Sequence, residues 1–288
     1  MNIENGLEED MKEISAVNGI CLSLEERFKL LTMLDQLKSD IQCDEMQFWG
    51  KIIGAEKDYY ISKALYYKGY QNFPKKKYFF CSSSNFLFSE LPDIQPHHID
   101  DFYKFNTYFI GNPDIILEKY DSEQNKNINE VIGETFKPKL KKKNMTETDR
   151  LSFVVRTIDH DTSIVPVGGY KMLPINEIRR NDLFEGLSSE DLDKKEKYVH
   201  FRPVENQEKK DKIAMGKAIF DFEFLDTIAD DAVKDSWSLH VDSTKTVCTL
   251  RNLIWPGYFA FHKANTDQFS GVYLGYGIKN VDIPFMQQ

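Results

Sequence analysis

The chain has 288 residues, 41% of them hydrophobic and 29% charged, and its 46 acidic residues against 37 basic ones give a net charge of −9. This composition predicts a globular protein, because a disordered chain lacks the apolar surface that offsets lost chain entropy. The negative charge argues against nucleic acid or an anionic membrane as a partner, unless basic residues cluster on one face.

The cysteines and the apolar runs bear on the compartment. Cys21, Cys43, Cys81 and Cys248 lie too far apart for a CxxC metal knuckle or a local disulfide framework. The longest nearly apolar run, 253–261, is about half of the roughly 20 residues that a membrane-spanning helix needs. No segment resembles a signal peptide, so we expect a cytoplasmic protein with reduced thiols and no membrane span.

The N-terminal part divides near residue 20. Residues 1–20 are acidic and weakly patterned, which predicts a loose tail, with a sparsely populated helix as the alternative. Ser23 and Glu26 then have capping-box spacing, and apolar residues recur at helical spacing over 30–37. We therefore expect a docked helix from Ser23 onward, and a single α+β domain over 21–288.

Residues 46–65 contain two runs that are typical of strands on either side of a turn, which predicts an antiparallel hairpin. In a regular strand, Phe48 would share one face with Ile52. Trp49 would then share the other face with Ile53. Both faces would be apolar, as expected for a strand that is covered on two sides.

The middle of the chain mixes strands, a loop and a helix. Residues 77–83 and 104–113 read as further strands. A polar stretch near 118–145, with five lysines within Lys137–Lys143, predicts an exposed loop. A second helix begins near Thr146, where apolar residues recur at helical spacing behind an acidic first turn.

Strand patterns return at the C-terminal end. Residues 236–241 alternate between apolar and polar side chains, and further runs lie at 246–255, 258–262 and 271–276. These runs predict an antiparallel C-terminal β-meander. Because strands cluster rather than alternate with helices, the predicted class is α+β, with antiparallel β-sheets and packed helices.

The histidines offer little chemistry. His97-His98 precedes two aspartates, and His160 lies between two more, but no HExxH or second spaced ligand pair accompanies them. We interpret them as solvated turns or helix-end charges. Histidines at 200, 240 and 262 lie in strand-like sequence and are expected at an edge or facing outward.

Other catalytic signatures are also missing from the sequence. There is no GxSxG elbow and no Cys-His signature. The segment "GYGIKN" at 275–280 lacks the third glycine and the GK[ST] ending of a phosphate loop, and reads as a strand end. We expect no catalytic residue, no cofactor, no metal and no small-molecule substrate.

Aromatic residues are the abundant feature, with 21 Phe, 14 Tyr and 3 Trp. They predict a large core, and buried aromatic anchors also dominate many interfaces. Trp255-Pro256-Gly257 reads as a strand that ends at a turn with the indole sealing the sheet; a subunit interface is the alternative. The candidate structural or interface residues are Phe48, Trp49, Trp237, Trp255, Pro256, Gly257, Phe259 and Phe261.

Six segments, in this order and with nearly this spacing, resemble the radial spoke head protein 9 family. They are "FWGKIIGAEKDYYISKAL", "LFEGLS", "YVHFRP", "DSWSLHV", "LRNLIWPGYFAFH" and "GVYLGYGIKNVDIPFM". The resemblance spans residues 23–286. Residues 1–20, 69–77 and 137–143 depart from the family pattern, so no contact is carried over to them.

The resemblance implies a non-enzymatic subunit of the radial spoke head in motile cilia and flagella, which helps to transmit signals between the central pair and the dyneins. Its implied partners are radial spoke head 4/6 type subunits and the spoke-scaffold protein, with the central pair apparatus as a further contact. Two alternatives remain open on the residues alone. One is a cytosolic enzyme that uses His97, His98 and nearby carboxylates, and the other is a protein-binding module that uses the Lys137–Lys143 loop.

Overall fold

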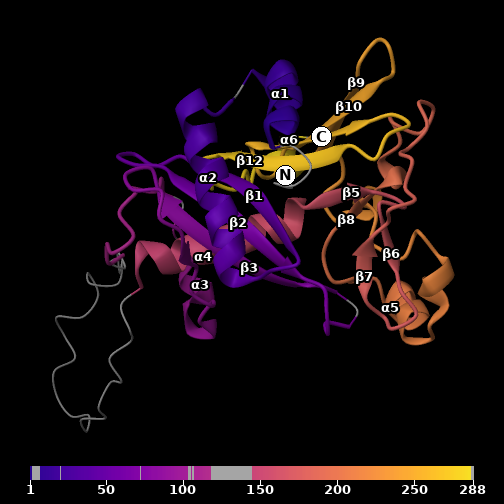
Figure 1. The fold of residues 1–288 in the computed structure, drawn as a ribbon, viewed down its shortest axis with the longest axis horizontal. Coiled ribbons are helices and arrows are strands. Elements are labelled where there is room, and N and C mark those ends of the chain that lie inside the picture. Colours follow the sequence, from indigo (N-terminus) through magenta and orange to yellow (C-terminus); the bar gives the residue numbers. More distant parts are fainter. Residues whose placement is uncertain are drawn as a thin grey trace, which may run out of the picture.

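The main element of the fold is a sheet of eight strands, shown in Figure 1 with helices on both of its faces. The computed structural model describes residues 1, 7–19, 21–71, 73–102, 105, 107–117 and 145–286. The strand order is β4-β3-β2-β1-β12-β11-β10-β9. The bounds are β1 Glu45–Ile52, β2 Tyr59–Tyr66, β3 Lys75–Ser82, β4 Ser89–Glu90, β9 Trp237–Val241, β10 Val247–Asn252, β11 Tyr258–Lys263 and β12 Phe269–Gly275.

Two short sheets and the helices complete the described elements. β5 Ile164–Pro166 pairs with β8 Tyr198–His200, and β6 Tyr170–Met172 pairs with β7 Ile178–Arg180. The α-helices are α1 Leu7–Asn18, α2 Leu24–Ile41, α3 Ile99–Phe102, α4 Glu147–Thr162, α5 Gln207–Ala214 and α6 Ile283–Met286. Single 3₁₀ turns are η1 Pro96–His98, η2 Lys195–Lys197, η3 Lys217–Phe220 and η4 Ile228–Asp230.

The large sheet consists of two antiparallel blocks that meet at β1 and β12. The α+β class and the C-terminal β-meander are confirmed. The sheet is nevertheless mixed, because β1 and β12 run parallel, with Gly50 opposite Tyr273. A Cβ on Gly50 would lie 2.1 Å from the Tyr273 carbonyl oxygen, so only glycine permits this approach.

Helices cover both faces of the sheet. Ser23 and Glu26 form the expected capping box at the start of α2, whose Leu30 and Leu34 are buried with Phe48 on one face. On the other face, α4 begins at its N-cap Thr146, as expected, and packs Leu151 and neighbouring apolar residues against the sheet. Figure 1 shows α2 crossing the strands on the side opposite α4.

The expected loose tail is corrected over residues 7–18. These residues form α1, whose Leu7, Met11 and Ile14 are each no more than 1% exposed. They lie in the same apolar cluster as Leu30 and Phe48. The three side chains recur at helical spacing, so a short stripe is buried although the segment as a whole is acidic.

Two strand predictions differ in detail. A bulge between Phe48 and Gly50 shifts the register of β1 against β2, so Trp49 and Ile52 lie in one apolar cluster and Phe48 in the opposite one. The predicted pairing of Phe48 with Ile52 on one face was therefore wrong, because a bulge adds one residue and reverses the alternation. Of the strand expected over 104–113, the described part makes only an isolated bridge between Gly54 and Phe109.

A smaller lobe extends from the sheet, at lower right in Figure 1, and contains β6, β7 and α5. Its apolar cluster includes Leu65 of β2 together with Phe201 and Ile213. The lobe therefore packs directly on the main sheet. The expected exposed loop near 118–145, with its lysines Lys137–Lys143, lies almost entirely outside the described residues.

Candidate interaction cleft and sheet edge

The candidate structural or interface residues divide into buried and surface positions. Phe48, Trp49, Trp237, Trp255 and Phe261 are buried. Gly257 and Phe259 are half-buried, and Pro256 is exposed. Gly257 has φ of +108°, and a Cβ there would lie 2.6 Å from the Leu274 carbonyl oxygen, so the turn after Trp255 requires glycine.

The buried indole of Trp255 makes a polar contact at its rim. Its Nε1–H donates to Asp161 Oδ2 at 2.8 Å, and the Lys279 ammonium lies 3.7 Å from the same oxygen. Burial acts to raise the pKa of Asp161, but hydrogen bonds from His160 and Trp255 and the charge of Lys279 outweigh it. The pKa therefore lies below its ordinary value, and the carboxylate keeps its negative charge.

Trp237 makes the same kind of contact, an indole hydrogen bond to a carboxylate. Its Nε1–H donates to Asp231 Oδ2 at 2.8 Å, and the other oxygen of Asp231 lies 2.7 Å from His200 Nε2. The His200 side chain is only 1% exposed, and its Nδ1 has no hydrogen-bond partner among the described residues. Two tryptophans that belong to the core thus each hold one carboxylate in place.

Both carboxylates line one cavity of about 530 Å³, which we call the acidic cleft. Its walls come from the end of α4, from β8 and the segment after it, from η4 and from the end of β10. The lining residues are His160, Asp161, His200, Arg202, Glu205, Asn206, Asp226, Thr227, Asp230, Asp231, Ala232, Val233, Asn252 and Ile254. Five carboxylates face one guanidinium, so the cleft is strongly negative and suits a cationic group.

The carboxylates of the cleft differ in how far they are already engaged. Asp226 accepts the main-chain N–H groups of Glu205 and Asn206, and Glu205 pairs with Arg202 at 3.2 Å. Asp230 is exposed at the rim, and no side-chain hydrogen bond or ion pair of its carboxylate is found among the described residues. Asp230 is therefore the carboxylate best placed for an outside partner.

The strand β9 lies at one end of the strand order and forms an edge of the main sheet. Asp242 donates its N–H to Val247, and Leu253 donates to Ser236, so even-numbered residues face β10. The main-chain groups of Trp237, Leu239 and Val241 then point outward. We call this row the β9 edge.

The histidines lie differently from what was expected. His240 is exposed on β9, as predicted, but His200 and His262 are each 1% exposed, so the expectation that they face outward was wrong. His262 Nε2 accepts the N–H of Leu187, and its Nδ1 lies 3.2 Å from the Gln268 carbonyl oxygen. These two internal partners hold the imidazole in the interior, although the sequence around His262 resembles that of an edge strand.

The sequence offered candidates for ion binding, among them the His97-His98 pair and the glycine-rich segment 275–280. In the described part of the chain, no group of three or more His, Cys, Asp or Glu side chains is arranged to hold a metal ion. His98 is 4% exposed and packs its ring against Phe102, so it is not a solvated turn residue. In the glycine-rich segment 275–280, the Gly277 N–H donates to the Tyr273 hydroxyl at 2.9 Å and is thus already used internally.

Among the described helices, none combines the length and apolarity that a membrane crossing requires.

The sequence patterns marked both tryptophans but did not mark Asp231 and Asp230. No local pattern marks these aspartates, because their role depends on β8 and β9 meeting in space.

The fold and these surfaces define a class: an α+β protein with an open sheet edge beside an acidic cleft. Residues 3–76 match a family model described as "Radial spokehead-like protein". Radial spoke head protein 9 homologs of Danio rerio, Homo sapiens and Bos taurus are each 32% identical to this chain, over 275, 276 and 279 residues respectively. Each comparison covers 95% of this chain and 96% of the relative.

The chain therefore belongs to the radial spoke head protein 9 family. It is a component of the radial spoke head and so belongs to the axoneme of cilia and flagella.

Proposed function

We propose that this chain is a non-enzymatic, structural subunit of the radial spoke head that helps to pass signals between the central pair and the dyneins of the outer doublets. The observation that carries the proposal is the similarity to radial spoke head protein 9 homologs over 95% of the chain. Coverage of this extent includes both blocks of the main sheet, the helices on its two faces and the smaller lobe.

The fold supports a mechanical role. Apolar clusters fill both faces of the eight-stranded sheet, and closely packed interiors deform little under load. We further propose that the chain from residue 21 onward forms a single domain, to which α1 adds packing on one face. A subunit of this kind acts through its shape and its contacts, and needs no reacting group.

The proposed partners are the radial spoke head 4/6 type subunits and the spoke-scaffold protein, with the central pair apparatus as a further contact. The surface that supports protein binding is the β9 edge with the acidic cleft beside it. The buried Trp237 and Trp255 fix the cleft carboxylates from within, so these residues have a structural role that also shapes the surface.

The test is to tag the chain in a ciliated cell, extract axonemes with salt and measure by quantitative mass spectrometry what co-purifies. Recovery of other radial spoke subunits in a fixed ratio is expected. An axonemal or soluble chain that carries none of them would overturn the proposal.

A further inference from the structure

We propose that the β9 edge and the acidic cleft together bind an extended, basic segment of another protein chain, which adds a strand to the main sheet and places a lysine or arginine side chain in the cleft. The inference rests on the proposed structural role and names the surface that such a subunit uses. It specifies a mode of docking that a structural role by itself does not require.

The β9 edge has the features of a binding edge. The outward N–H and C=O groups of Trp237, Leu239 and Val241 have no main-chain partner in the described part of the chain. Proteins ordinarily protect such edges with lysine, proline, a bulge or a very short strand. The sequence "WSLHV" of β9 contains no charged residue and no proline, and its register with β10 is regular.

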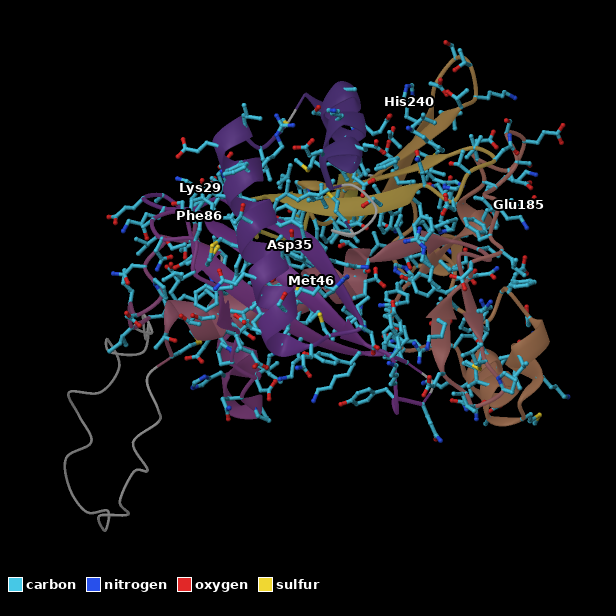
Figure 2. All side chains as sticks on the ribbon, viewed as in Figure 1. Lys29, Asp35, Met46, Phe86, Glu185 and His240 are labelled. Atoms are coloured by element: carbon cyan, nitrogen blue, oxygen red, sulfur yellow. The ribbon has the colours of Figure 1, made fainter. Side chains whose placement is uncertain are left out.

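The opposite edge of the same sheet shows the contrast. The strand β4 at that end has two residues, Ser89 and Glu90, and Glu90 pairs with Lys77 at 2.9 Å. A short strand with a charged pair is a protected edge. The β9–β10 hairpin, in contrast, extends away from the body of the molecule in Figure 1, with His240 labelled on it in Figure 2.

The acidic cleft lies at the Trp237 end of this edge. Trp237 is opposite Asn252, which lines the cleft, and its indole holds the cleft residue Asp231. Five residues of β9 span roughly 17 Å, so a paired segment of similar length reaches from the hairpin to the cleft. Edge and cleft therefore form one continuous surface.

Two features of the cleft bear on its occupant, one on the charge of that occupant and one on its polarity. The first is its charge, five carboxylates against one guanidinium, with Asp230 exposed at the rim. The second is His200, a cleft residue that is 1% exposed and whose Nδ1 has no hydrogen-bond partner among the described residues. An unpaired polar atom at that depth has a cost that a bound polar group can relieve.

The charges also select the class of partner. A second copy of this chain would bring another net charge of −9 and another acidic cleft to the contact, which electrostatic repulsion opposes. Nucleic acid is excluded on the same ground. A basic protein segment satisfies both the main-chain groups of the edge and the charge of the cleft.

The edge is tested with the same serine-to-lysine substitution at each end of the sheet. Ser238→Lys places a lysine beside the β9 edge, and Ser89→Lys is the matched control on β4; both serines are exposed. Each variant replaces the endogenous chain in ciliated cells, and its ratio to other spoke subunits in salt-washed spokes is measured. We expect Ser238→Lys to lower that ratio about tenfold, with Ser89→Lys near wild type and both melting temperatures unchanged.

The cleft is tested with a charge reversal. Asp230→Lys alters the cleft rim, and Asp35→Lys makes the same change on the exposed side of α2, where Asp35 is labelled in Figure 2. We expect the Asp230→Lys chain to dissociate from the spokes at a lower salt concentration than wild type, and the Asp35→Lys chain to behave as wild type. Equal behaviour of Asp230→Lys and Asp35→Lys would overturn the cleft half of the proposal.

The occupant is identified by photo-crosslinking in intact purified spokes, with His240→benzoylphenylalanine and, as control, Ser89→benzoylphenylalanine. The expected product joins position 240 to a lysine- or arginine-containing segment of another subunit. Crosslinks to a second copy, or none above the control, would contradict the proposal. If the chain still co-purifies with spokes while Ser238→Lys matches Ser89→Lys, the proposed function stands and this inference fails.

Discussion

The indole of Trp255 and the carboxylate of Asp161 are joined across the boundary between core and surface, Nε1 to Oδ2, at 2.8 Å. Trp255 is 4% exposed and lies in the cluster between the main sheet and α4. Asp161 lines the acidic cleft. A core side chain, Trp255, therefore positions a carboxylate at the surface. A substitution of Trp255 should affect the position of Asp161 as well as the packing of the core.

Trp255→Ala is expected to lower the free energy of unfolding by about 3–5 kcal/mol, because it removes a large buried side chain. Trp255→Phe keeps most of the packing but loses the hydrogen bond to Asp161, and about 1–2 kcal/mol is expected. Urea denaturation of the purified chain measures both. Unchanged stability of Trp255→Ala with lost spoke association would assign Trp255 to an interface instead of the core.

Asp159 holds two buried ammonium groups, from Lys63 at 2.9 Å and from Lys76 at 2.6 Å. Burial acts to raise the pKa of Asp159, but the two lysines outweigh it and hold the pKa well below its usual range. Asp159→Asn would leave both charges uncompensated, at a cost of about 3–5 kcal/mol.

The control for Asp159→Asn is Asp93→Asn. Asp93 pairs with Arg156 at 3.3 Å, but its side chain is 96% exposed, so little change in stability is expected. Urea denaturation at pH 7 compares the two variants. Similar losses of stability in both would contradict the assignment of Asp159 as the carboxylate that balances the interior charges.

His262 should make the fold sensitive to mild acid. Burial lowers its pKa from 6.5 to about 4, against a smaller opposing effect of the Gln268 carbonyl. Because the folded pKa is the lower one, the unfolded chain takes up a proton first as pH falls, and stability is lost between pH 6.5 and about 4. The loss attributable to this ring amounts to about 3 kcal/mol at most.

The measurement is the free energy of unfolding against pH for wild type, His262→Gln and the exposed-site control His240→Gln. Glutamine offers an acceptor and a donor but does not titrate. The difference between wild type and His262→Gln should change steadily from pH 6.5 to 4, whereas His240→Gln should follow wild type. Parallel curves for all three would show that His262 is not buried in its neutral form.

Met11 tests whether α1 is part of the fold. Its side chain is fully buried against the cluster that includes Leu30 and Phe48. Met11→Ala is expected to cost about 2–5 kcal/mol, and Lys12→Ala on the exposed side of α1 almost nothing. If chemical denaturation gives equal values for the two variants, α1 is not docked on the sheet.

Local signals predicted much of this fold. The capping box at Ser23 and the acidic first turn after Thr146 marked the true starts of α2 and α4. Two strand-like runs around a turn identified the hairpin, and strand patterns identified the C-terminal meander. The parallel contact of β1 with β12 was not predicted, because it joins the two ends of the chain and depends on close approach at Gly50.

The candidate site was less predictable. The aromatic composition of the chain and the strand-like sequence around them identified Trp237 and Trp255. The contacts of their indoles were not predicted. Asp231 has no distinguishing neighbours in sequence, and its contacts with His200 and Trp237 arise only when β8 and β9 come together. The acidic cleft is thus a property of tertiary structure, and so is the burial of His200 and His262.

A chain that is built into the radial spoke head should leave a gap there when it is missing. The most direct measurement is cryo-electron tomography of axonemes from cells that lack the chain, with subtomogram averaging of the spokes and rescue by the tagged wild-type chain. We expect spoke heads that lack density, while the outer doublets and dynein rows keep theirs, and recovery of the missing density on rescue. Complete spoke heads in cells without the chain would contradict this expectation.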